Sequence, residues 1–254
     1  MAVNENIKEA FQMEKVVVDQ SFWDLFPDAQ VNILYANGID NHDMDKNVAE
    51  RRKMLANAVK EADKFLTNET FRLNPVIDQW RKAYQQFKKK KGARASIEAL
   101  LKRANQGRTF DPIDPMVDVY NSISMTYGVP VGMEDRDKIK GAMHLGQVDG
   151  GQAFRPVGAD DDEPTLPGEV CYYDEEGAVC RCLNWRDAQR TMLTEDSQNV
   201  VAVIESVNAE QAERANEAME ELSKLINKYF GVETTNVYHL TKDNPVAEVP
   251  ADMQ

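Results

Sequence analysis

The sequence has 254 residues and lacks long apolar runs, and this absence together with a shortage of cysteine excludes several classes of protein. No stretch approaches the ~20 apolar residues that a membrane-spanning helix needs. Three cysteines form no disulfide framework, as expected in a reducing compartment. The N-terminal residues have no basic segment followed by an apolar one, so they do not resemble a signal peptide. We therefore expect a soluble cytoplasmic protein that contacts no membrane.

The motifs of nucleotide-binding and nucleophilic enzymes are also missing. There is no P-loop, no dinucleotide fingerprint and no nucleophile elbow. Cys180 and Cys182 have no second pair of thiols, although strand alternation would place both on one face, and buried small side chains explain them better. The acidic run Asp160, Asp161 and Asp162 lacks the spacing of a cation-binding loop. The sequence predicts neither a metal nor a cofactor.

Positive charge is scarce overall but concentrated in one segment. The formal net charge is −13, which argues against binding a polyanion over the whole surface. Residues 81–108 nevertheless contain ten Lys or Arg and one acid, so this segment carries +9 and the remainder −22. Such asymmetry indicates a local anion-binding face. A solvated helix face followed by a lysine-rich turn is the simpler explanation, and both stay open.

Apolar periodicity predicts an α+β fold with antiparallel sheets, sandwich-like and flanked by helices. A hairpin is expected over 169–185 with its turn at DEEG. We expect one compact unit, with an N-terminal αβ segment over 1–94, a core domain over 95–240 and a polar tail over 241–254. The predicted strands lie at 15–19, 30–36, 200–204 and 236–240, and the predicted helices at 44–66, 75–88, 96–104, 115–127 and 208–230.

The helix expected over 115–127 has the clearest signals. Pro115 opens it and Gly128 stands in the C-terminal capping place. A helical wheel puts Asn121 at the margin of the buried face and points Asp118 well away from it.

Two segments carry a resemblance to a known family. PIDPMVDVYNSISMTYGVPVGMEDRDKIKG (112–141) and TEDSQNVVAVIES (194–206) resemble the B3/B4 domain of the phenylalanyl-tRNA synthetase β subunit, and together the similarity spans about 95–210. The stretch from SFWDLFPDAQ (21–30) to SIEALLKRANQG (96–107) is more similar to free-standing versions of the domain. In the synthetase this domain hydrolyses tRNA that carries the wrong amino acid. The resemblance implies tRNA, through its 3′ aminoacyl end, as the partner, and not DNA; it leaves the oligomeric state open.

The resemblance also implies site residues. Tyr120 and Asn121 match a Thr-Asn pair that lines the editing pocket. Glu205 matches a glutamate that reads the misattached side chain, and Gly177 and Ala178 match small residues in the pocket floor. An aminoacyl ester is labile enough to be hydrolysed by positioning a water, so no nucleophilic side chain is required.

At one position the sequence departs from the synthetase. Gly132 stands where the synthetase has a histidine that handles the substrate end, and a glycine has no side chain to donate or accept a hydrogen bond. The synthetase's own specificity is therefore not expected. Editing hydrolysis in trans and binding of tRNA or an amino-acid-like ligand without hydrolysis both stay open.

The polar stretch NWRDAQRTMLTED (184–196) is expected to face the Asn121 helix from the hairpin end. The alternative is a structural network in which Arg186 or Arg190 pairs with Glu195 and Trp185 covers a sheet edge. The substrate-binding residues expected from this stretch are Asn184, Trp185, Arg190, Thr191, Thr194 and Glu195. The residues expected to attract tRNA phosphates are Lys88, Lys89, Lys90 and Lys91.

Overall fold

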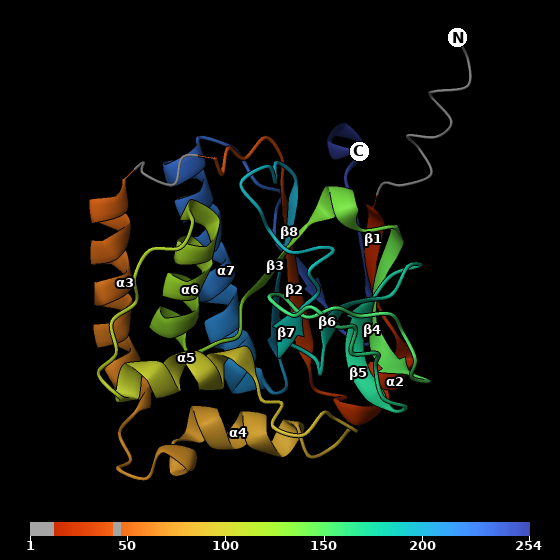
Figure 1. Ribbon diagram of the computed structural model, residues 1–254, viewed down its shortest axis with the longest axis horizontal. Helices are drawn as coiled ribbons and strands as arrows, with labels where there is room; N and C mark the ends of the chain where they lie inside the picture. The colour runs from red at the N-terminus through yellow and green to blue at the C-terminus, as the bar shows by residue number, and fades with distance from the viewer. Residues whose placement is uncertain (1–12, 43–46) are drawn as a thin grey trace.

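The computed structural model describes residues 13–42 and 47–254, and in them two β-sheets stack beside a layer of helices (Figure 1). The strands are β1 (Met13–Val18), β2 (Gln30–Ala36), β3 (Gly132–Asp135), β4 (Gly141–Val148), β5 (Glu169–Tyr173), β6 (Ala178–Arg181), β7 (Arg186–Asp187), β8 (Val200–Ser206), β9 (Tyr238–Leu240) and β10 (Val246–Glu248). The α-helices are α2 (Gln20–Leu25), α3 (Val48–Ala62), α4 (Pro75–Ala83), α5 (Ser96–Asn105), α6 (Pro115–Tyr127) and α7 (Ala209–Phe230). Single 3₁₀ turns occur at η1 (Asp63–Phe65), η2 (Phe71–Leu73), η3 (Arg136–Lys138) and η4 (Ala251–Met253).

The two sheets are mostly antiparallel, as the sequence predicts. One has the strand order β10-β1-β4-β5-β6-β7 and the other β3-β8-β2-β9. The β1–β4 pair is parallel, while the other strand pairs of the described residues are antiparallel. In each sheet an early strand lies between later ones: β1 between β4 and β10, and β2 between β8 and β9. Segments from both ends of the chain therefore complete both sheets.

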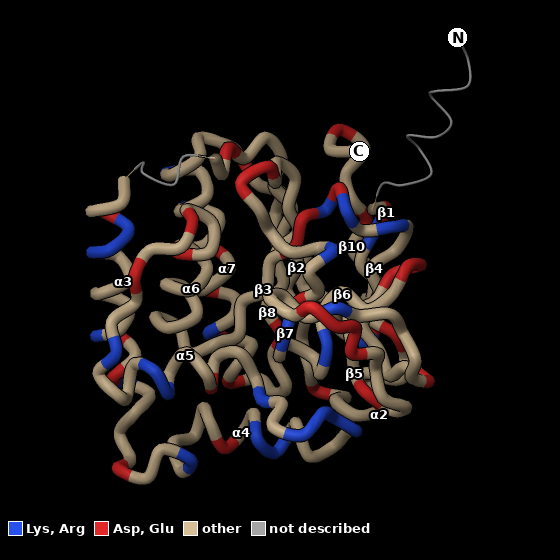
Figure 2. Tube along the Cα trace, viewed as in Figure 1, with Lys and Arg blue, Asp and Glu red and all other residues tan. Residues whose placement is uncertain are grey.

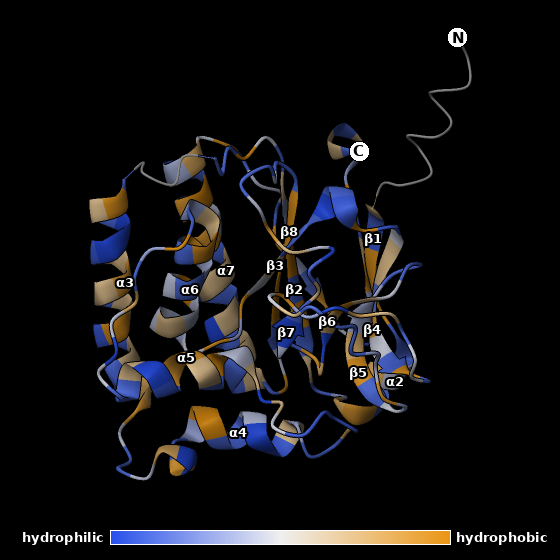
Figure 3. Ribbon diagram, viewed as in Figure 1, coloured by the Kyte–Doolittle hydropathy of each residue, from blue (hydrophilic) through white to orange (hydrophobic). Residues whose placement is uncertain are grey.

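The four-stranded sheet is buried on both faces, which explains its continuous apolar runs. On β8, Val201 and Val203 face the core between the sheets, whereas Ala202 and Ile204 pack in a second core against α6 and α7. The apolar runs are visible as the orange strands at the centre of Figure 3, between the helices and the six-stranded sheet. The strand predicted at 200–204 is confirmed as part of β8.

Most predicted elements are present, with different ends. The expected helix over 75–88 ends at Ala83, because Tyr84 and Phe87 turn into the core with their rings 5.2 Å apart. The expected helix over 44–66 is α3 followed by η1, and its first residues fall outside the described ones. Residues 241–254, expected to be a polar tail, instead contribute β10 and η4.

Asp118 corrects the helical-wheel reading of α6. The wheel pointed it away from the core, but its side chain is 1% exposed and forms an ion pair with Arg51 of α3. Since α3, α5 and α7 all pack on α6, the helix has more than one buried face. Among the described residues no helix is long and apolar enough to cross a membrane.

Candidate functional site

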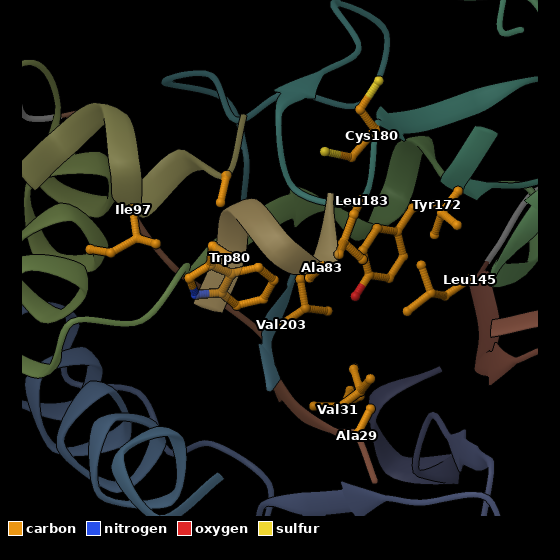
Figure 4. Close-up of a cluster of buried hydrophobic side chains, with 14 of the residues drawn as sticks. Ala29, Val31, Trp80, Ala83, Ile97, Leu145, Tyr172, Cys180, Leu183 and Val203 are labelled. Atoms are coloured by element: carbon orange, nitrogen blue, oxygen red, sulfur yellow. The ribbon is translucent and has the colours of Figure 1, made fainter. Parts of the chain in front are cut away.

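A pocket of about 250 Å³ opens where the helical layer meets the facing ends of the two sheets. Its walls come from α5, α6, β3, β8 and the β6–β7 hairpin, so the helix near the middle of the chain and the later hairpin end do converge. Of the residues expected from the sequence, those that line it are Tyr120, Asn121, Gly132, Asn184, Trp185 and Glu205. Figure 4 shows Tyr172, Cys180 and Val203, three further lining residues, within the adjoining buried cluster.

Helix α6 forms the pocket wall that contains Asn121, and both of its ends are capped. The Asp114 side chain accepts a hydrogen bond from the Val117 N–H at 2.9 Å, which caps the first turn. Gly128 ends α6 at φ 63°, in the left-handed region that glycine adopts most easily. Tyr120 and Asn121 project from this helix toward the pocket.

A strained turn carries the opposite wall. Strand β6 ends at Arg181, and the next two residues, Cys182 and Leu183, have φ of 48° and 66°, which non-glycine residues rarely adopt. The Tyr84 hydroxyl donates to the Cys182 carbonyl at 2.7 Å and the Leu183 N–H donates to the Val170 carbonyl at 2.7 Å, so the turn is held from both sides. The turn directs Asn184 and Trp185 into the pocket.

The same turn breaks the predicted strand alternation. Cys180 lines the pocket, while the Cys182 thiol donates to Glu169 Oε1 at 2.6 Å, so the two thiols do not share a surface. All three cysteines are buried and free. Within the described residues no cluster of three or more His, Cys, Asp or Glu side chains is placed to hold a metal ion.

Glu205 lies at the base of the pocket in a fixed orientation. Its Oε1 accepts from the Tyr172 hydroxyl at 2.7 Å and its Oε2 from Asn184 Nδ2 at 3.0 Å. The side-chain oxygen of Asn184, Oδ1, in turn lies 3.0 Å from the Tyr84 hydroxyl. Burial raises the pKa of Glu205 above its ordinary value, although both hydrogen bonds favour the ionised form. The strand β8, the turn and the six-stranded sheet are thus joined through one carboxyl.

The pocket also contains two acids that the sequence analysis missed. Glu134 of β3 and Asp187 of β7 both line it, and burial together with the charge of the neighbouring Asp187 raises the pKa of Glu134 well above its ordinary value. Their only sequence signal is an acid inside each of two very short strands. That signal is weak, because charged residues in short edge strands are common on protein surfaces.

The other expected site residues lie outside the pocket lining. Arg190 pairs with Asp174 at 2.7 Å rather than with Glu195, and it also donates to the Lys138 carbonyl at 2.9 Å. Thr191 is buried and Glu195 is exposed. A Cβ on Gly177 would come within 2.4 Å of the Ala153 carbonyl oxygen, so a close backbone approach accounts for that glycine. The expected residues that do not line the pocket are Gly177, Ala178, Arg190, Thr191, Thr194 and Glu195.

The basic segment is the blue stretch that follows α4 in Figure 2 and leads into α5. Its helix α5 contributes Ser96, Ala99 and Leu100 to the pocket wall. Lys88 and Lys91 are exposed, while Lys90 forms an ion pair with Glu163. Positive charge therefore lies on the same element as one wall of the pocket.

The chain is similar to known proteins in its sequence and in its fold. A family described as the B3/4 domain matches residues 79–237. The solved structure of an N-terminal fragment of the phenylalanyl-tRNA synthetase β subunit from Pyrococcus horikoshii is similar over 92% of this chain and 54% of that one, with 15% identity and a TM-score of 0.50. The chain thus matches about half the length of that fragment. No curated protein matches the sequence.

Proposed function

This chain belongs to the B3/4 domain family, and on that basis we propose that it associates with tRNA and hydrolyses misaminoacylated tRNA in trans. The fold it shares with the synthetase fragment supports tRNA as the partner. The observation that carries the proposal is the pocket itself, in which the Asn121 helix and the Trp185 turn enclose a space of about 250 Å³, of a size for an aminoacyl group.

The composition of the pocket suits an amino-acid side chain with an ester at one end. Leu100, Val131 and Met143 supply apolar walls, and Trp185 supplies an aromatic face. In the proposed reaction, water adds to the ester carbonyl carbon, the bond to the ribose oxygen breaks, and that oxygen leaves with a proton. The products are the free amino acid and uncharged tRNA.

The position of α5 supports a path for the tRNA end. The helix lines the pocket with one face and carries Lys102 and Arg103 in its last turn. Lys89 and Arg94 lie in the connection before it. A phosphate backbone following this element would arrive at the pocket, since basic side chains attract nucleic acid without regard to sequence.

The test is release of amino acid from a panel of mischarged tRNAs. We expect the wild-type protein to deacylate at least one member faster than buffer, and Trp185→Ala and Asn121→Ala to slow that reaction by at least about tenfold, because each removes part of the wall that orients the ester. Glu213→Gln, on an exposed position of α7, is the matched control. No release from any member of the panel would contradict hydrolysis.

A second function, binding without hydrolysis, is favoured by Gly132. This residue lines the pocket where the resemblance implies a histidine, and the described lining contains no histidine. Retained binding of a mischarged tRNA together with an unchanged ester half-life would select this function. Loss of that binding in Trp185→Ala would locate it in the pocket.

A further inference from the structure

Two carboxyls from different sheets meet at one end of the pocket. Glu134 lies on β3, the edge strand of the four-stranded sheet, and Asp187 lies on β7, the edge strand of the six-stranded sheet. The Asp135 N–H donates to the Thr191 carbonyl at 2.9 Å, which fastens the end of β3 to the loop after β7. The fold itself brings the two acids together, rather than the flexibility of their side chains.

The surroundings of Glu134 require a proton between the two acids. Glu134 is 4% exposed, and no donor among the described residues makes a well-aligned hydrogen bond to its Oε2. Burial and then the neighbouring Asp187 raise the pKa of Glu134 well above its ordinary value. Burial also raises the pKa of Asp187 above its ordinary value. Since two buried carboxyls that face the same cavity are not both ionised without a counter-charge, the pair holds one proton.

The pocket supplies no cation that could replace this proton. The described lining contains three acids, Glu134, Asp187 and Glu205, and no lysine, arginine or histidine. Arg190 is the cation that acts on Glu134, but its guanidinium already bonds to both Asp174 oxygens at 2.7 and 2.9 Å.

The thiol and the hydroxyl groups around the pair are neutral, so Glu205 is the one other acid of the described lining. Burial raises the pKa of the Cys180 thiol and of the Tyr120 and Tyr172 hydroxyls well above their ordinary values, so these groups carry no charge at physiological pH.

We propose that Glu134 and Asp187 bind the ammonium group of an amino acid whose carboxyl is esterified or amidated, and that the ammonium displaces the proton they share. The only bond that breaks is the O–H bond of the shared proton, which passes to solvent water, one for each ligand bound. A free amino acid adds a carboxylate to a chamber that already holds three acids and no cation, so the same pocket rejects it. The identification of the natural ligand as an aminoacyl ester rests on the proposed function. In that reaction the free amino acid is the product, and its rejection by the pocket would release it after hydrolysis.

Calorimetry with amino-acid amides tests this proposal without any hydrolysable ester. The probes are leucinamide, methioninamide, phenylalaninamide and tyrosinamide, each compared with its free amino acid and with the amide lacking the amino group. At pH 6 the probes' amines are charged. We expect at least one amide to bind about ten- to a hundredfold more tightly than both its free amino acid and its des-amino amide. This is the difference expected for a charge-assisted hydrogen bond.

The proton is measured by repeating the titration in buffers of different ionisation enthalpy. Wild-type protein should release about one proton per amide bound, because the pair holds one. Glu134→Gln should keep amide binding through Asp187 and release none, Asp187→Asn should lose at least about tenfold in affinity, and Glu213→Gln should match the wild type. If either pair variant fails to fold, the wild-type proton count and probe comparison decide alone.

Three results would overturn the proposal: amides that bind no better than their des-amino partners, free amino acids that bind as well as amides, or amide binding without proton release. These outcomes are separate from the deacylation assay. A protein that binds amides as described but leaves every mischarged tRNA intact would refute hydrolysis and keep the ammonium site. Deacylation of mischarged tRNA by a protein that binds amides no better than their des-amino counterparts would support hydrolysis and refute the ammonium site.

Discussion

Glu134 is a buried acid whose effect on stability changes with pH. The pKa of Glu134 is raised in the folded state. Its contribution to the free energy of unfolding is therefore fully present below the ordinary carboxyl pKa and is lost as pH rises through the raised pKa. Glu134→Gln mimics the protonated acid at every pH. We expect this variant to match the wild type near pH 4.5 and to exceed it at pH 8 by about 1–2 kcal/mol.

The measurement is urea unfolding of both proteins across this pH range, with Glu213→Gln as the exposed control. A stability difference between Glu134→Gln and wild type that does not grow with pH would mean that Glu134 is ionised in the folded protein at neutral pH.

Glu205 allows a second test, which separates its role as a hydrogen-bond acceptor from the role of its negative charge. Glu205→Leu leaves the Tyr172 hydroxyl and Asn184 Nδ2 buried without their acceptors, which should cost about 2–4 kcal/mol in the free energy of unfolding. In Glu205→Gln the amide oxygen accepts from Asn184 and the amide nitrogen donates to the Tyr172 hydroxyl, so the loss should stay below about 1 kcal/mol. Equal losses in urea titrations of the two variants would show that the negative charge matters instead.

At this scale the sequence indicated only part of the site. Asn121, Trp185 and Glu205 lie in motifs that follow in order along the chain, so sequence reasoning reaches them. Glu134 and Asp187 meet only where the edges of two different sheets come together, and no local spacing encodes that meeting. The left-handed φ of Cys182 and Leu183 directs Trp185 into the pocket. The sequence does not predict this conformation, because neither position is a glycine.

Among the elements, the helices α6 and α7 are the best predicted. Both α6 and α7 have an acceptor at the N-cap and a glycine at the C-cap, and such signals are local. The predicted end of α4 was wrong by several residues because tertiary structure decides it: the Lys88 N–H bonds to the Gly168 carbonyl at 3.2 Å, which draws the chain away from the helix.

The two capping glycines form a matched pair for mutation. Gly231 of α7 has open space around it, so Gly231→Ala should cost about 1 kcal/mol for the left-handed φ alone. A Cβ on Gly128 would lie 2.8–3.0 Å from the Phe65 ring, so Gly128→Ala should cost about 2–3 kcal/mol. Thermal or urea unfolding compares them, and equal costs would mean that Phe65 moves aside freely.

For the whole molecule, the charge asymmetry predicts how tRNA binding depends on salt. Reversing Lys88, Lys89 and Lys91 should weaken binding and reduce the slope of log Kd against log salt by up to about one for each phosphate that is no longer neutralised. Reversing Lys90 should have less effect on this slope, because it is already paired with Glu163.

The control reverses three exposed or partly exposed lysines of the outer helices, Lys53 and Lys60 of α3 and Lys224 of α7. An unaltered salt slope after reversal at 88, 89 and 91, measured by filter binding from about 50 to 200 mM salt, would show that those lysines are solvated and do not contact RNA.

The B3/4 match covers residues 79–237, yet a fragment with those limits should not fold. It would lack β1 and β10 of one sheet and β2 and β9 of the other, which leaves β4 and β8 each with an unpaired edge. We expect the isolated fragment to show no cooperative unfolding and poor dispersion in NMR spectra, whereas the full chain should unfold cooperatively. A cooperative transition in the fragment would contradict this.

Because β1 and β2 are neighbours of β10 and β9, which are synthesised about 200 residues later, the order of synthesis matters. While the chain is on the ribosome, β1 has β4 to pair with but not β10, and β2 has β8 but not β9. Apolar strand edges stay open until residues 238–248 leave the exit tunnel, so a translation stall before that point would leave a species prone to aggregate.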